Sequence, residues 1–271
     1  MNASLFQRSD IPRFDIPDVR NRVSPEEWRV RVDLAACYRL VAHFGWNTLI
    51  YNHISARVPG DDEHYLLNPF GLLYEEITAS NLVKVDLKGN IVDRGPHRVH
   101  PAGFTLHRAV HQFRPDVMCA LHVHTVAGMA VSAMECGFLP LTQNAMLFHG
   151  NVAYHDFEGL ALDCDENERV ARDFGSKNIL ILRNHGYMVA ASSVELTFLM
   201  TYSLEIAMQA QVQALASGQK LVVPSDDAAA QTARLGFNNK ENNDFAPHSK
   251  ERIEWPAMLR LLDRIDPSYK S

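Results

Sequence analysis

The sequence lacks several features that mark exported and membrane-embedded proteins. Its 271 residues include only four cysteines, and none of them has the C-x-x-C spacing of a metal ribbon or a redox motif. No run of 18 apolar residues occurs, and the first 15 residues mix charge with proline where a secretory signal would need an apolar segment. We therefore expect a soluble protein of the reducing cytoplasm that has no membrane partner.

The sequence also lacks a basic run of the kind that binds nucleic acid. Lys and Arg number 26 against 32 Asp and Glu, which gives a formal net charge of −6. Nucleic acid is therefore not an expected partner. The hydrophobic fraction of 46% is enough to bury a full core, and the length fits one main domain.

What the sequence does contain is a pair of histidines at the end of an apolar strand pattern. The segment from Val117 to His124 alternates, so His122 and His124 fall on the same face of the predicted strand. Both rings can therefore point at the same spot.

A third histidine follows a second apolar strand pattern about sixty positions later. Residues 178–182 read as a buried strand, and Asn184-His185-Gly186 forms a turn before an apolar run resumes. Neutral imidazole is a common zinc ligand, and three protein ligands leave a coordination position open for water or substrate. We predict that His122, His124 and His185 bind a catalytic metal ion, the alternative being three ordinary polar residues at strand ends.

The remaining patterns interleave helices and strands without an internal repeat. Helices are expected over residues 24–44, 78–82, 101–113, 125–134, 165–175, 193–217, 226–235 and 255–264. Strands are expected over residues 48–58, 65–67, 83–87, 91–93, 117–124, 139–143, 152–154, 178–182 and 187–191. Residues 1–23 are interpreted as an extended arm, 24–220 as the main domain, and 221–271 as a loop and helix extension.

Together the motifs resemble the class II aldolase/adducin family, typified by fuculose phosphate aldolase, over roughly residues 25–215. The resemblance rests on Asn52-His53-Ile54-Ser55-Ala56-Arg57, Asn68-Pro69-Phe70-Gly71, Arg114-Pro115-Asp116, His122-x-His124, Val131-Ser132 and Asn184-His185-Gly186. It implies an α/β fold, a three-layer α/β/α sandwich with a central, mostly antiparallel sheet. It also implies a homotetramer with active sites between subunits, and Zn²⁺ on His122, His124 and His185, with Mn²⁺ or Fe²⁺ as other possible ions.

The sequence departs from the aldolases of this family at positions that they use for catalysis and for binding phosphate. By the resemblance, Gly103 stands where they carry a catalytic glutamate, and Asn144 lies near the position of a catalytic tyrosine. The phosphate-binding residues are replaced by Pro101, Ala102, Phe70 and His53, while Gly71 is kept. A phosphate dianion needs several donors, so a phosphorylated sugar is not the expected substrate.

The expected function is a metal-dependent lyase, of the aldolase or decarboxylase type, for a small non-phosphorylated hydroxy, oxo or aromatic acid. The titratable candidates for proton transfer are His100, His107, His149 and Tyr154. His53 and Gly71 are candidates for binding the small-molecule substrate. Each has a simpler interpretation, since His53 could cap a strand and turn chemistry explains the loops around His149 and Tyr154.

Three further interpretations stay open. The protein could be an adducin-like, non-catalytic oligomeric interaction module, which Gly103 and a tail over residues 253–269 similar to adducin favour. It could carry out iron-based oxygen chemistry, which a triad without a carboxylate disfavours. His107 and His111, spaced i and i+4, could form a second metal pair or serve as packing residues.

Overall fold

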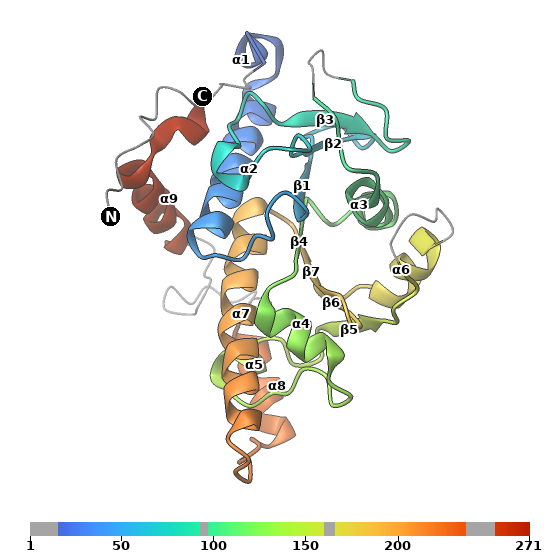
Figure 1. Ribbon diagram of the computed structural model, residues 1–271, viewed down its shortest axis with the longest axis vertical. Helices are drawn as coiled ribbons and strands as arrows, with labels where there is room; N and C mark the ends of the chain where they lie inside the picture. The colour runs from blue at the N-terminus through green and yellow to red at the C-terminus, as the bar shows by residue number, and fades with distance from the viewer. Residues whose placement is uncertain (1–15, 93–96, 160–165, 237–252) are drawn as a thin grey trace, which may run out of the picture.

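The centre of the molecule is a seven-stranded sheet in the order β3-β2-β1-β4-β7-β6-β5, seen in the computed structural model of Figure 1. The structure describes residues 16–92, 97–159, 166–236 and 253–271. The strands are β1 (His53–Arg57), β2 (His64–Leu67), β3 (Val83–Asp86), β4 (Cys119–Val123), β5 (Val152–His155), β6 (Ile179–Leu182) and β7 (Gly186–Ala191). Only β5 and β6 run parallel, so the mostly antiparallel sheet predicted from the sequence is confirmed.

Helices cover both faces of the sheet (Figure 1). On one face lie α2 (Pro25–His43), α4 (Val126–Ala133), α7 (Val194–Ala216) and α9 (Glu254–Ile265), with α5 (Gln143–Met146) and α8 (Asp226–Leu235) packed at the far end of α7. On the other face lie α3 (Pro101–Phe113) and α6 (Glu166–Phe174). Short helical segments are α1 (Val19–Arg22), η2 (Tyr74–Glu76) and η3 (Pro267–Lys270).

Strand β4 divides its side chains between the two cores as the alternation predicts. Cys119, Leu121 and Val123 pack with α2 and α7, whereas Ala120 packs with α3 and α6. The expected three-layer α/β/α sandwich is therefore confirmed. No helix in the described ranges combines the length and apolarity that crossing a bilayer would require.

Three expected elements differ in the structure. The strand expected over 48–58 begins only at His53, because Leu49 adopts a left-handed φ of 50° and the Asn52 side chain accepts a hydrogen bond from the Thr48 amide. No helix forms over 78–82, where Thr78 and Asn81 close a turn through reciprocal side-chain bonds.

The third difference concerns residues 139–143, which form no strand. The Leu139 amide donates to Gln211 of α7 instead of to a neighbouring strand, and Thr142 caps the short helix α5. Within the expected N-terminal arm, the described residues include the short helix α1 and a buried Ile16. Asp165, the expected cap of α6, and Asp93 of the expected hairpin lie outside the described residues.

Candidate metal centre

The three predicted metal ligands come from adjacent strand ends. His122 lies in β4, His124 follows the last residue of that strand, and His185 lies in the turn between β6 and β7. Because β4 pairs antiparallel with β7, with Val123 opposite Tyr187, the end of β4 meets the start of β7. The sheet therefore brings together side chains that are about sixty residues apart in the sequence.

The three imidazoles converge closely enough to hold one metal ion. One ring nitrogen from each lies within 4.8 Å of the other two. The Nε2 atoms of His122 and His124 are 2.8 Å apart, and the ring of His185 lies 4.9 Å and 4.6 Å from their centroids. Within the described ranges this ligand group contains three histidines and no carboxylate.

The turn that carries His185 depends on a glycine at the next position. A Cβ atom on Gly186 would lie 2.5 Å from the Val123 carbonyl oxygen and 3.1 Å from Cδ2 of His124. Asn184 before it adopts a left-handed φ of 57°, a conformation that Asn tolerates better than most residues. The sequence Asn184-His185-Gly186 thus allows the two histidine segments to pass in contact.

The protonation of His122 is fixed by a backbone contact. Its Nδ1 donates to the Tyr187 carbonyl oxygen at 2.9 Å, so its Nε2 carries a lone pair directed at His124. Hydrogen bonds of this kind, from a ring nitrogen to a backbone carbonyl oxygen, orient metal-binding histidines in proteins. A cation shared by the three rings fits this donor set.

The triad is held in the neutral form that binds metal ions. Burial lowers the pKa of His122 well below its ordinary value, and the neighbouring His124 and His185 add to this effect. Burial and the proximity of His185 lower the pKa of His124 to about 4, and burial also lowers the pKa of His185. All three rings are therefore neutral at pH 7.

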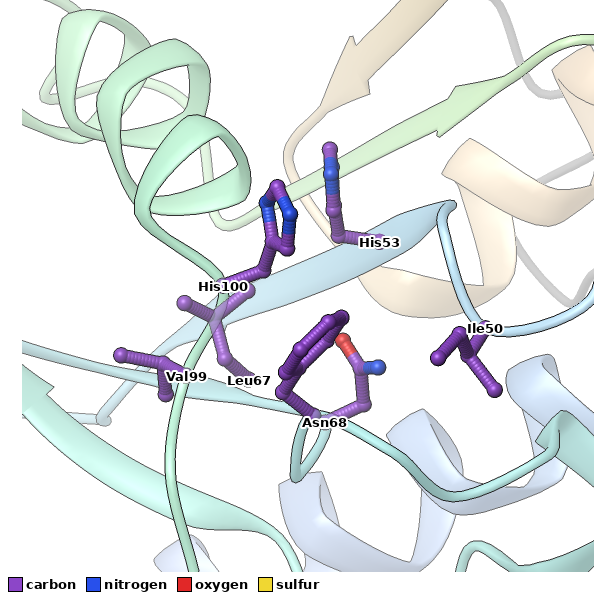
Figure 2. A pocket seen from close by; sticks show the side chains of 7 residues that line it. Ile50, His53, Leu67, Asn68, Val99 and His100 are labelled. Carbon is purple, nitrogen blue, oxygen red and sulfur yellow. The ribbon is translucent and has the colours of Figure 1, made fainter. Parts of the chain in front are cut away.

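Figure 2 shows a small hollow lined in part by His53 and His100. It is lined by Ile50, His53, Leu67, Asn68, Phe70, Val99 and His100. The His53 ring stacks 5.5 Å from the ring of His122, which places the hollow next to the predicted metal ligands. His100 lies 6.4 Å from His53 and 4.7 Å from the half-exposed ring of Phe70.

Two imidazole nitrogens of this hollow have no hydrogen-bond partner in the described part of the chain. They are Nδ1 of His53 and Nδ1 of His100, both inaccessible to bulk water. A buried polar atom without a partner is uncommon and calls for an unplaced water, ion or ligand. Two of the histidines that line the hollow therefore each have a buried ring nitrogen without a described partner.

The other predicted catalytic residues make contacts elsewhere. His149 lies 3.4 Å from Asp226 at the start of α8, and the Tyr154 hydroxyl accepts a bond from the Phe138 amide. The ring of Tyr154 also stacks under Arg183, whose guanidinium donates to the Met134 carbonyl. Of these candidates, His100 lines the hollow and lies 6.4 Å from His53, whose ring in turn stacks on that of His122.

His107 and His111 are buried in the sheet-facing side of α3. The Ser55 hydroxyl lies 2.5 Å from Nδ1 of His107 and 2.7 Å from Nε2 of His111 and bridges the two rings. Arg57, another residue of β1, donates to the His111 carbonyl and to other carbonyls of the nearby backbone. These contacts match the packing interpretation of the histidine pair.

The sequence analysis missed a buried carboxylate behind the triad. Glu205 of α7 is 1% exposed and accepts hydrogen bonds from the hydroxyls of Thr125 at 2.5 Å and Tyr187 at 2.6 Å. The sequence signal for it was an acidic residue, Glu205, in the middle of a mostly apolar helical segment.

Comparison with known proteins agrees with the fold. The model of the class II aldolase and adducin N-terminal domain matches residues 32–212. The crystal structure of an aldolase II superfamily protein from Pseudomonas syringae is 45% identical, has a TM-score of 0.85, and aligns over 93% of this chain and 99% of that one.

A curated protein and a further solved structure are also similar to this chain. Mouse alpha-adducin is 52% identical over 246 residues, which are 87% of this chain but 33% of adducin. L-fuculose 1-phosphate aldolase from Glaciozyma antarctica shares the fold, with a TM-score of 0.76 at 24% identity, and aligns over 91% of this chain and 93% of that one. The chain belongs to the class II aldolase and adducin family.

Proposed function

We propose that the protein is a divalent-metal-dependent carbon–carbon lyase, of the aldolase or decarboxylase type, acting on a small non-phosphorylated hydroxy, oxo or aromatic acid. The observation that carries this proposal is the convergence of three neutral imidazoles within 4.8 Å of one another. A divalent ion held by them would polarise a substrate carbonyl and stabilise the negative charge that develops beside it. The all-nitrogen ligand set favours Zn²⁺ and also accommodates Mn²⁺ or Fe²⁺.

The hollow beside the triad supports a substrate without phosphate. Its lining has no Lys or Arg among the described residues, whereas a phosphate dianion is bound by several charged or hydroxyl donors. Ile50, Leu67, Phe70 and Val99 supply apolar walls, and His53 offers a hydrogen bond. We propose that this hollow receives the part of the substrate that lies away from the metal.

His100 is the proposed proton donor. It stands at the N-terminus of α3 and lines the same hollow, while Gly103, at the position of the family's glutamate, brings no carboxylate. Decarboxylation begins with the departure of carbon dioxide and needs no base at that step, so one proton donor completes the reaction. His100 is positioned to supply that proton to a substrate held between the hollow and the triad.

The proposal is tested by turnover of a panel of hydroxy, oxo and aromatic acids, with phosphorylated sugars as the comparison. We expect release of carbon dioxide or an aldehyde from at least one acid, loss of this activity on chelation, and its return with Zn²⁺ or Mn²⁺. His100→Gln should abolish turnover while retaining the metal. His64→Gln is the control, because the ring of His64 pairs with Asp61 in a hairpin turn, and this variant should retain both turnover and metal. Turnover of the phosphorylated sugars alone would contradict the proposal.

The second candidate is an adducin-like interaction module without catalysis. The 52% identity to mouse alpha-adducin favours it. Three converging neutral imidazoles have no evident use in such a module, which is why we place the lyase first. A protein that binds no metal and turns over no acid on the panel would reverse that order.

We also propose that the chain forms a homotetramer, as the family resemblance implies. Sedimentation equilibrium should then give a mass four times that of one chain. A monomer would contradict a site shared between subunits and leave the triad of each chain unaffected.

A further inference from the structure

Glu205 is the one acidic residue in the buried face of α7, and its environment is costly for a carboxylate. The side chain is 1% exposed, and burial raises its pKa. Its hydrogen-bond partners in the described structure are neutral, the hydroxyls of Thr125 and Tyr187 and, at 3.4 Å, the amide of Gln209. An apolar residue in this position would avoid the cost of burying a polar group, so the carboxylate must do something that an apolar residue cannot.

The first hydroxyl, that of Thr125, belongs to the residue that follows His124. Thr125 donates to Oε1 of Glu205 and accepts from the Gly128 amide, which makes it the N-cap of α4. His124 lies between the end of β4 and this cap, outside the hydrogen-bonded ladder of the sheet. The position of its backbone therefore depends on how firmly Thr125 is held.

The second hydroxyl, that of Tyr187, belongs to the residue whose carbonyl orients His122. Tyr187 donates its phenol to the same Oε1 atom, and its main-chain oxygen accepts from Nδ1 of His122. Its ring packs so tightly on α4 that a Cβ atom on Gly128 would lie 2.6 Å from it. One carboxylate oxygen thus joins α7 to a neighbour of each of two metal ligands.

We infer that Glu205 is a positioning residue, which holds His124 through Thr125 and His122 through Tyr187 in the arrangement that binds the metal. This inference rests on the proposed metal site and adds a residue 20 positions beyond the triad to the parts that determine its affinity. Hydrogen bonds to residues next to metal ligands help to orient those ligands, and removing such a bond weakens metal binding without removing a ligand.

The test compares two nearly isosteric variants. Glu205→Met removes the acceptor and leaves both hydroxyl hydrogens without an acceptor, whereas Glu205→Gln keeps an acceptor oxygen. The measurements are the Zn²⁺ affinity, by competition with a chelating indicator, and the visible absorption spectrum of the Co²⁺-loaded protein, which reports ligand geometry. We expect Glu205→Met to weaken Zn²⁺ binding by about tenfold or more and to change the Co²⁺ spectrum, and Glu205→Gln to stay close to the wild type.

Gln211→Met provides the matched control on the same helix. Gln211 is also fully buried, but it bonds to Leu139 and Gly137, away from the triad. This variant should lose stability and keep both the Zn²⁺ affinity and the Co²⁺ spectrum. Equal weakening of Zn²⁺ binding in Gln211→Met and Glu205→Met would show a general effect of destabilisation and overturn the inference.

Two milder variants keep the test decisive if Glu205→Met does not fold. Thr125→Val and Tyr187→Phe each remove one hydroxyl, and each should weaken Zn²⁺ binding, with less than additive effects in the double variant because both act through one oxygen. Wild-type affinity in both single variants would overturn the inference while leaving the proposed function intact. A wild-type protein that binds no Zn²⁺, Mn²⁺ or Fe²⁺ would overturn both.

Discussion

At the scale of single residues, the geometry of the candidate metal centre depends on a few individual atoms. A hydrogen in place of Cβ at Gly186 lets the His185 turn contact the end of β4, and one hydrogen on Nδ1 of His122 directs the lone pair of Nε2 towards His124. Such details follow from contacts between segments far apart in the chain. The sequence predicts which histidines are involved and does not predict how each ring is oriented.

Gly186→Ala should therefore disturb both the fold and the triad. The added methyl would lie 2.5 Å from the Val123 carbonyl, so one strand end must move. We expect a loss of about 1–3 kcal/mol in the free energy of unfolding, measured by urea denaturation, together with weaker Zn²⁺ binding. Gly60→Ala is the control. At a φ of +73° an alanine is strained and should lose stability, but nothing lies within 4 Å of the new methyl, so the metal affinity should not change. Wild-type Zn²⁺ affinity in Gly186→Ala would contradict the role of this contact.

The buried pair His107 and His111 should make the protein sensitive to acid. Burial lowers the pKa of each ring to about 3 from an ordinary value of 6.5, with added effects from His111 on His107 and from Arg57 on His111. The unfolded chain binds these protons below pH 6.5 and the folded chain does not. The stability present above pH 6.5 is therefore lost as the pH falls towards 3, by up to about 1.4 kcal/mol per pH unit for each ring.

The measurement is urea denaturation at several pH values between 7 and 4. The double variant His107→Gln, His111→Gln should show a shallower fall in unfolding free energy with decreasing pH than the wild type. Parallel curves for the two proteins would show that other groups cause the acid sensitivity.

At the scale of secondary-structure elements, local sequence patterns predict most helices, whose caps and apolar spacing lie within one segment. Ser24 begins α2 as expected, and Ser193 begins α7. The failures fall where a side chain replaces the expected backbone pairing, as Asn52 does before β1 and Gln211 does at Leu139. The hollow and the Glu205 contacts were also missed, because they join segments that only the folded sheet brings together.

Ser24→Ala tests the contribution of one cap. The Ser24 hydroxyl accepts from the Glu27 amide at 3.1 Å, and Glu27 in turn binds the buried Arg31. We expect the variant to lose about 1 kcal/mol of unfolding free energy, with Ser24→Asp close to the wild type. The readout is the urea midpoint at constant slope, and an unchanged midpoint in Ser24→Ala would contradict a stabilising cap.

At the scale of the whole molecule, the sandwich fold determines where the candidate site lies but does not determine which reaction it catalyses. The order of strands puts β4 between β1 and β7, which brings His53 on one side and His185 on the other to His122. L-fuculose 1-phosphate aldolase from Glaciozyma antarctica shares this fold, and mouse alpha-adducin is 52% identical in sequence. The fold alone therefore does not decide between the two proposed functions. The lyase proposal rests instead on the three neutral imidazoles and on the neighbouring hollow, whose lining has no described Lys or Arg.

The metal content of protein purified without chelators tests that arrangement most directly. Elemental analysis of the wild type should give one equivalent of a divalent ion per chain, most of it zinc or manganese. His185→Ala should lose the ion and remain folded by circular dichroism. The three ligands of an open site contribute to metal affinity far more than they contribute to the stability of the hydrophobic core. A wild-type protein without metal, or full occupancy in His185→Ala, would contradict the assignment of His122, His124 and His185 as a metal site.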